Sequence, residues 1–167
     1  MNVRSVLLVC AVAAVAATAA CGSSSSSSDT PAPACPTDNP DCKEAATTDE
    51  GAKLVNDKGC PKCHTQNMAG NNVALTTDSA GKPVASDVKL YPPNLTNDPD
   101  TGLGKWTDDE IARAIRQGID DQGLMLCPQM NHFSSFNDYE AYSVVKYLRS
   151  IPAVKNTVPA STCPPLK

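Results

Sequence analysis

The spacing of apolar side chains predicts three helices. Each begins at a residue that can cap a helix N-terminus and has a glutamate three positions later, which is the capping-box pattern. The three pairs are Thr47 with Glu50, Thr107 with Glu110, and Asn137 with Glu140. Apolar residues then recur at helical spacing, and the predicted helices end at about Lys58, at Gly118 and at Pro152. No other segment shows a convincing strand alternation, so the predicted fold class is all-α with long irregular loops.

The N-terminus has the pattern of an export signal. Arg4 is the only charged side chain in the first 28 residues, and residues 6–20 form an almost wholly apolar run that is too short to span a bilayer comfortably. Small residues precede Cys21, which resembles a bacterial lipobox, although Thr18 stands where leucine is usual. We expect residues 1–20 to be a signal peptide and Cys21 to be acylated, so that lipid anchors the protein on the periplasmic side of a bacterial membrane. An ordinary signal peptide cleaved nearby is the alternative.

Residues 21–48 are expected to form a flexible spacer between the lipid and the folded part. They contain six consecutive serines, Ser23–Ser28, and four prolines, so they cannot bury much apolar surface. Cys35 and Cys42 lie inside this spacer. A local disulfide between them is the plain interpretation in an oxidising compartment.

Composition limits the possible functions. A chain of 167 residues allows one domain, and 8 cysteines in that length argue against an ordinary cytosolic enzyme. The net charge of −4 argues against nucleic acid as a main partner. Residues 65–105 are rich in Gly, Pro, Asn and Asp. An irregular segment of that length is unusual inside a compact domain, so something other than side chains is expected to fill the space beneath it.

Cys60, Cys63 and His64 form a Cys-x-x-Cys-His motif directly after the first predicted helix. This spacing is typical of c-type haem attachment, because two thiols a helical turn apart can add to the two vinyl groups of one haem while the histidine ligates its iron. A thioredoxin-like redox pair would need a βαβ context. A structural zinc site would want a second pair of ligands. The sequence shows neither pattern, so we expect one covalently bound haem c.

Several motifs in order along the chain resemble the class I cytochromes c. They are residues 51–64, Pro92–Thr96, Asp98–Trp106, Ile115–Asp120, Cys127–Met130 and Tyr147–Pro152. The middle segments are especially similar to the cytochrome subunits of bacterial dehydrogenases. The resemblance implies a cytochrome c-like fold over residues 49–155, with three or more helices around the haem and a tail at 156–167. It also implies that small Gly51 allows a close approach of Tyr147 where the first and last helices cross.

Met130 is the expected second axial ligand of the iron. The family carries this ligand in a Pro-x-Met segment between the last two helices, and Pro128–Met130 matches that segment. Met68 lies too close to the proximal histidine to reach the opposite face easily, and Met125 is expected to fill a gap in the core. His132 could replace Met130, which would lower the reduction potential that Met/His ligation raises.

The resemblance also implies further contacts around the haem. His64 is expected to donate its free ring N–H to the carbonyl of Pro93 or Pro92, which would fix the orientation of the ring. Trp106 is expected to hydrogen-bond a haem propionate, with core packing as the alternative. Two further residues could either contact the propionates or form a turn: Asn94 and Thr96.

Four cysteines remain after those of the signal peptide, the lipid site and the haem motif. They are Cys35, Cys42, Cys127 and Cys163, and they permit three pairings. The local pair leaves Cys127–Cys163, which would tie the C-terminal tail to the loop that bears the expected methionine ligand. Our hypothesis is that this bond holds the ligand loop against the iron.

The expected function is therefore electron transfer by a single haem. A six-coordinate iron leaves no site for a substrate, and the negative net charge favours partner proteins with a basic docking patch. A dehydrogenase or a respiratory oxidase would suit that role. Two alternatives stay open: a peroxidase-like or gas-binding haem with an open sixth site, and an electron-transfer subunit of a dehydrogenase complex.

Overall fold

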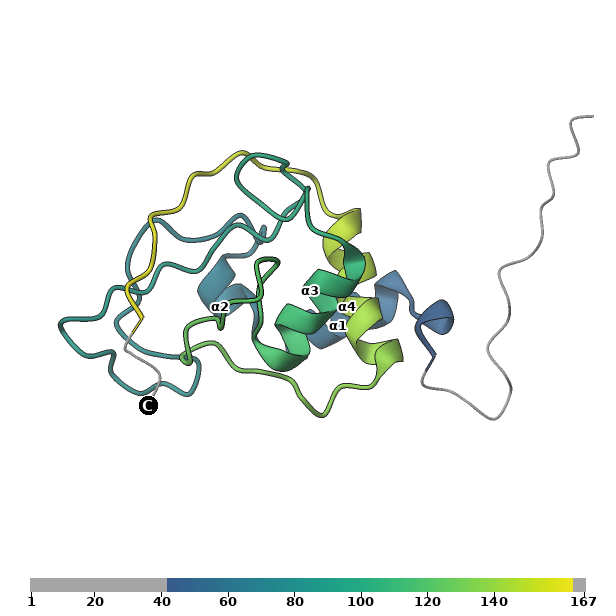
Figure 1. Cartoon of the computed structure of the whole chain (residues 1–167), viewed down its shortest axis with the longest axis horizontal. Helices are drawn as coiled ribbons and strands as arrows, with labels where there is room; N and C mark the ends of the chain where they lie inside the picture. Colours follow the sequence, from purple (N-terminus) through teal and green to yellow (C-terminus); the bar gives the residue numbers. More distant parts are fainter. Residues whose placement is uncertain (1–41, 164–167) are drawn as a thin grey trace, which may run out of the picture. The chain divides into compact units, whose positions relative to one another are not determined.

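The computed structural model describes residues 42–163 and is all-helical over that range (Figure 1). Its elements in chain order are the 3-10 helix η1 (Lys43–Ala45) and the α-helices α1 (Thr48–Asp57), α2 (Pro61–His64), α3 (Asp108–Gln117) and α4 (Asp138–Ser150). Within residues 42–163, β-structure is limited to three isolated bridges. The predicted all-α fold is confirmed, and the three predicted helices correspond to α1, α3 and α4.

The capping residues act as the sequence predicts. Thr107 and Asn137 each take part in a full capping box, and the Thr47 side chain accepts from the third amide of α1. Each bond satisfies a backbone donor that has no partner inside its own helix. Gly118 ends α3 in the left-handed region, with φ of 68°, where glycine carries no Cβ penalty.

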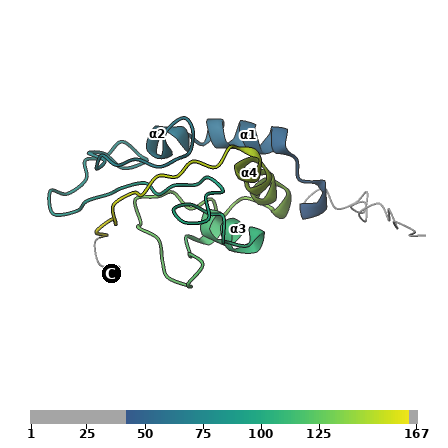
Figure 2. The same ribbon diagram turned by 90° about the horizontal axis from the view of Figure 1, so that it is seen from above.

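Helices α1 and α4 cross at very short distance (Figure 2). A Cβ atom built on Gly51 would lie 1.9 Å from the Ser143 carbonyl oxygen and 2.8 Å from the Tyr147 Cβ atom. The expected close approach of Gly51 and Tyr147 is therefore confirmed. The crossing buries Val55 and Val145, each 1% exposed, in the same apolar core.

The folded part begins earlier than the predicted boundary at residue 49. Residues 42–47, which we expected to belong to the flexible spacer, pack on α4. The Lys146 ammonium donates to the Ala46 carbonyl over 2.7 Å, and the Thr47 amide donates to the Ser143 hydroxyl over 3.0 Å. A capping motif marks where a helix begins, so it does not reveal a preceding segment that packs on another helix.

Several predictions for the N-terminal region concern residues outside the described range. They are the signal peptide, acylated Cys21, the serine run and the partner cysteine Cys35. Cys42 itself takes part in a disulfide. Within residues 42–163, the helices lack the combination of length and apolar character that a membrane span requires.

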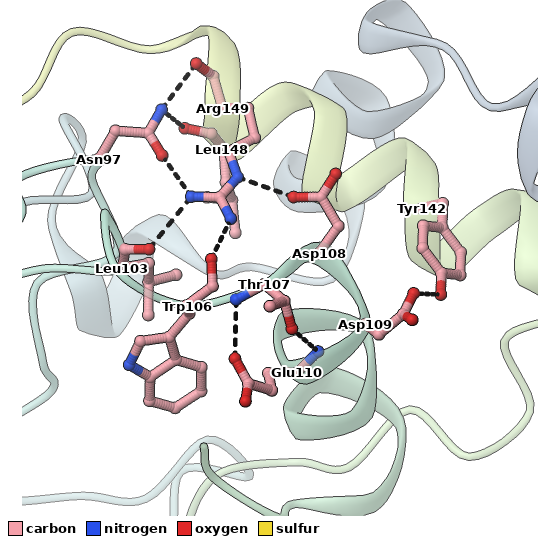
Figure 3. A network of polar contacts seen from close by, with 10 residues as sticks. All are labelled: Asn97, Leu103, Trp106, Thr107, Asp108, Asp109, Glu110, Tyr142, Leu148 and Arg149. Carbon is pink, nitrogen blue, oxygen red and sulfur yellow. Dashed lines mark hydrogen bonds and ion pairs between the residues drawn. The ribbon is translucent and has the colours of Figure 1, made fainter.

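Tyr142 on α4 hydrogen-bonds the Asp109 carboxylate on α3 (Figure 3). Burial, followed by this bond and by the charge of Asp109, raises the pKa of the Tyr142 phenol to about 12. In the unfolded chain the phenol would ionise near its ordinary pKa of 10.0, whereas in the folded protein it stays protonated until the pH approaches about 12. The contribution of Tyr142 to stability is thus full below pH 10.0 and is lost as the pH rises toward about 12.

We expect Asp109→Asn to move the ionisation of one tyrosine down toward pH 10.0. The substitution removes the carboxylate charge that disfavours the phenolate, and ultraviolet titration of the folded protein measures the change. Asp57→Asn, at the end of α1, is the matched control and should leave the titration as it was. An unchanged curve in Asp109→Asn would contradict the assignment of the raised pKa to this pair.

Candidate functional site

Helix α2 is a single helical turn that holds the Cys-x-x-Cys-His motif. Cys60 stands at its N-cap, Pro61 occupies the first helical position, and the His64 amide donates to the Cys60 carbonyl over 3.0 Å. The Cys60 and Cys63 thiols are free and half-buried. Burial raises the pKa of both, so both are protonated at neutral pH. The turn thus presents two unoxidised thiols one helical turn apart.

His64 is buried, and its ring orientation is fixed by a distant segment of the chain. Its Nδ1 atom lies 2.9 Å from the Pro93 carbonyl oxygen, 29 residues further on. A carbonyl can only accept, so Nδ1 carries the proton and Nε2 keeps its lone pair. Burial lowers the pKa of His64, which favours the neutral imidazole that a metal requires. Of the two carbonyls that the sequence offered, the structure places that of Pro93 at the ring.

Met130 lies half-buried in the loop between α3 and α4, and two distant segments hold this loop. The Ser79 hydroxyl lies 3.0 Å from the Gln129 carbonyl oxygen and 2.9 Å from the Asn131 Oδ1 atom, so it meets the residues on either side of Met130. A disulfide joins Cys127, three positions before Met130, to Cys163 near the C-terminus.

The segment of Ser79 also borders the thiol motif. Asp78 is near enough to Cys63 for its charge to raise the pKa of that thiol, while Ser79 contacts the loop of Met130. The charge of Asp78 therefore acts on the thiol turn, while its neighbour Ser79 is hydrogen-bonded to the loop of Met130. We did not predict a role for Ser79. Its neighbour Asp78 is a residue type that favours turns, but the sequence does not show where such a turn packs.

The other methionines differ in their environment. Met68 is 1% exposed and belongs to the apolar core, in the region that follows α2. Met125 is 49% exposed, so our prediction that it fills a gap in the core was wrong. It lies at a narrow turn, where it pairs with Ile119 across an isolated bridge, and about half of its surface faces solvent.

Two polar atoms close to Met130 in the sequence are buried without a hydrogen-bond partner among the described residues. They are Gln129 Oε1 and His132 Nε2. The His132 ring packs against the C-terminal end of α3, because a Cβ atom on Gly118 would lie 2.0 Å from its Nε2 atom. Unpartnered buried polar atoms are rare in native proteins and indicate a bound group or water at such a place.

The family model for cytochrome c matches residues 48–152. The chain belongs to the cytochrome c family. The match covers α1, the thiol motif, α3 and α4, and it begins and ends close to the limits of residues 49–155 that the resemblance implied.

The cytochrome is similar to parts of larger bacterial proteins. It is 30% identical over 119 residues to a nicotinate dehydrogenase subunit of Pseudomonas putida, covering 70% of this chain and 10% of that protein. It is 31% identical over 126 residues to the cytochrome c subunit of a quinone-type alcohol dehydrogenase from Gluconobacter oxydans, covering 62% of this chain and 24% of that subunit. The fructose dehydrogenase cytochrome subunit of Gluconobacter japonicus is 27% identical over 99 residues, which are 56% of this chain and 20% of that subunit. The chain thus spans a quarter or less of the length of these relatives.

Membership in the family implies covalently bound haem c, and the residues of this cytochrome fit that group. Two free thiols stand one turn apart, and a buried neutral imidazole keeps one ring nitrogen for a metal. Gln129 and His132, which are close to Met130 in the sequence, each have a buried polar atom without a partner among residues 42–163. A four-ligand zinc site would need more protein ligands. Among residues 42–163, no three His, Cys, Asp or Glu side chains lie together in a way that could hold a metal ion.

Asn94 and Thr96 form a buried turn. Asn94 is 2% exposed, and its Nδ2 atom donates to the Val154 carbonyl over 2.7 Å and to the Thr101 hydroxyl over 3.1 Å. Its Oδ1 atom accepts from both the amide and the hydroxyl of Thr96. With these atoms committed to the protein, the structure favours the turn-forming role over a propionate contact.

Trp106 is held through its backbone by Arg149 of α4, while its indole ring points away from the guanidinium (Figure 3). The Arg149 guanidinium also donates to Asp108, to the Asn97 side chain and to the Leu103 carbonyl, over 2.9, 2.9 and 3.1 Å. The indole is partly buried against the apolar core. The loop that carries Trp106 is therefore tied to α4. Its indole N–H has no hydrogen-bond partner among residues 42–163 and is available for the role that the resemblance implied.

Proposed function

We propose that this cytochrome carries single electrons in the periplasm through one haem c with His64 and Met130 as axial ligands. The observation that carries the proposal is the buried neutral imidazole of His64, held by Pro93 beside two free thiols. This is the donor set that covalent haem attachment and proximal ligation need in one place. When bound, haem c would supply an iron that alternates between the ferrous and ferric states.

The roles of the residues follow from their chemistry. Cys60 and Cys63 would form the two thioether bonds, and the His64 Nε2 atom would ligate the iron. The Pro93 carbonyl keeps the proton on Nδ1. The imidazole is therefore held in the tautomer whose Nε2 atom has its lone pair available for the iron. Met130 would supply a thioether sulfur from its half-buried loop, which favours a higher reduction potential than a second histidine would.

A dehydrogenase is the partner that the comparisons support best. Relatives of the cytochrome include cytochrome subunits of alcohol and fructose dehydrogenases. A dehydrogenase partner would release substrate electrons one at a time to the haem, and an oxidase could accept them. The net charge of −4 suits a partner with a basic docking surface, where complementary charge accelerates association.

Lipid at Cys21 would hold the cytochrome at the membrane that contains its partner. Residues 21–41 would serve as the tether, since the folded part begins by residue 42. Its serine run is suited to a flexible link that lets the domain move between a donor and an acceptor. Mass spectrometry of the exported protein tests this part: an acylated cysteine is expected at its new N-terminus, and an unmodified one would contradict the anchor.

A visible and near-infrared spectrum with a redox titration of the holoprotein tests the electron-transfer role. We expect a low-spin spectrum, a methionine–iron charge-transfer band in the oxidised form, and one single-electron transition for one haem. A high-spin spectrum would contradict the proposal and favour an open sixth site. A low-spin spectrum without the methionine band would instead indicate bis-His ligation by His132.

The Cys127–Cys163 disulfide closes a loop with a sequence separation of 36 and ties down the segment of Met130. In the chain-entropy model a loop of this length stabilises the fold by about 3–4 kcal/mol. We expect Cys127→Ser combined with Cys163→Ser to weaken the methionine–iron band and to lower the reduction potential. An unchanged band and potential, alongside the loss of unfolding free energy, would contradict a ligand-holding role and leave a purely stabilising one.

A further inference from the structure

The chain beyond α4 returns to the site as a strap, which we define as residues 152–163 (Figure 1). The family match ends at residue 152, where the strap begins, yet the strap is well connected. The Asn156 side chain donates to the Ala69 carbonyl over 2.8 Å and accepts from Asn72 over 3.0 Å. Its backbone amide donates to the Thr101 hydroxyl. The strap is therefore seated on the irregular segment that follows α2.

The end of the strap clamps the segment that leads into Pro93. The Ser161 hydroxyl accepts from the Tyr91 amide over 2.7 Å and donates to the Tyr91 carbonyl over 3.1 Å. Next to it, Thr162 pairs with Lys89 in an isolated bridge: the Thr162 amide donates to the Lys89 carbonyl over 2.8 Å, and the Lys89 amide donates to the Thr162 hydroxyl over 2.9 Å. Four hydrogen bonds thus fix the backbone at Lys89 and Tyr91. Pro93, whose carbonyl accepts from His64, follows two residues after Tyr91.

The next residue of the strap holds the opposite segment of the site. Cys163 is bonded to Cys127, and the Cys127 carbonyl accepts from the Met130 amide over 3.1 Å. Ser161 and Cys163 are separated by one residue, so at most about 7 Å of extended chain lies between the two attachments. A displacement of Ser161 is therefore transmitted to Cys163, and a displacement of Cys163 to Ser161, because so little backbone lies between them.

We propose that residues 161–163 mechanically link the segment of Pro93 to the loop of Met130. The hydrogen bonds between Ser161 and Tyr91 would then also determine how firmly Met130 is held. Ser161 is thereby a positioning residue that acts through Tyr91 on one side and through the disulfide on the other. The inference rests on the proposed His64 and Met130 ligation. The proposal adds Ser161 to the residues that support this ligation. Ser161 lies far from the thiol motif in the sequence and outside the family match, so its position gives no sign of this role.

A double-mutant cycle on the holoprotein tests the link, with imidazole as the probe that displaces Met130 from the iron. Ser161→Ala removes both hydrogen bonds between the Ser161 hydroxyl and Tyr91. We expect it to lower the apparent imidazole Kd about three- to tenfold, which is within the range that the loss of one or two hydrogen bonds gives. In the background Cys127→Ser with Cys163→Ser, the same change should alter Kd by less than about twofold, because the link is already cut. Equal fold-changes in the two backgrounds would overturn the proposal.

Two further variants separate positioning from general loosening. Ser161→Thr keeps the hydroxyl and should restore the wild-type Kd to within about twofold. Ser150→Ala is the matched control, because it removes a serine hydroxyl that donates to the Tyr147 carbonyl at the end of α4. It should leave Kd unchanged, and a change as large as that in Ser161→Ala would overturn the assignment.

Amide hydrogen exchange supplies a readout that does not depend on ligation. In Ser161→Ala we expect faster exchange at Tyr91, which loses its acceptor, and also at Met130. Faster exchange at Tyr91 alone would overturn the link even if the cysteine variants did not fold. If the unmodified protein lacks the methionine–iron band, the proposed ligation by Met130 is wrong. The exchange rate of the Met130 amide would still decide whether the strap connects the segment of Pro93 to the loop of Met130.

Discussion

Replacing Met130 with alanine should abolish the methionine–iron charge-transfer band of the oxidised cytochrome and lower its reduction potential. A thioether favours ferrous iron, and its loss leaves water or a stronger donor such as imidazole in the sixth position. We expect a fall of roughly 0.1 V or more, within the ~0.8 V over which axial ligands set haem potentials. Near-infrared absorption and potentiometric titration measure the two effects.

Met125→Ala is the matched control for this change. Met125 lies in the same loop between α3 and α4, but it is 49% exposed, so its removal should alter neither the band nor the potential. A band that survives in Met130→Ala and disappears in Met125→Ala would reverse the assignment. A low-spin spectrum that lacks the band in the unmodified protein would point to His132, and His132→Ala would then convert that spectrum to a high-spin one.

The second large effect is expected from Gly51→Ala, which should destabilise the folded protein by about 3 kcal/mol. In an open helix this substitution would stabilise by up to ~1 kcal/mol, because alanine loses less backbone entropy than glycine. Here the new methyl group would lie 1.9 Å from the Ser143 carbonyl oxygen, which belongs to the backbone of α4 and cannot rotate away. The two helices must separate, and their apolar contacts weaken.

Denaturant unfolding of the oxidised holoprotein measures this loss as a lower transition midpoint. Gly81→Ala serves as the control: its φ of 78° is unfavourable for alanine, but a Cβ atom there meets nothing within 4 Å. It should lose only about 1 kcal/mol from the backbone conformation. Equal losses in the two variants would show that crowding at the crossing of α1 and α4 is not the cause.

Elements defined by neighbouring residues could be predicted well from the sequence. Capping boxes and apolar spacing gave α1, α3 and α4, since the cap and the first turn of a helix interact within a few residues. The thiol motif could be identified for the same reason: its two thiols and its imidazole occupy one helical turn. The resemblance of the separate motifs to the cytochromes c was confirmed by a family match over residues 48–152.

Predictions that depended on a side chain's surroundings fared less well. Exposed Met125 was expected in the core, because a methionine looks the same in sequence at a tight turn as in a packed interior. The segment of residues 42–47 was assigned to the spacer because its packing surface is provided by α4, about a hundred residues later. Neither environment leaves a local pattern that could be read.

The sequence alone thus determined the helices, the thiol turn and the family, all of which follow from contacts between residues close in the chain or from motifs in fixed order. Only the tertiary structure decided which carbonyl holds His64 and that Ser79 meets the loop of Met130. It also showed that Ser161 and Cys163 attach one short strap to two different segments. These contacts join residues 29 to 70 positions apart. Hydrogen-bonding side chains are common along the chain, and only the packing of the helices and loops selects the pairs that meet.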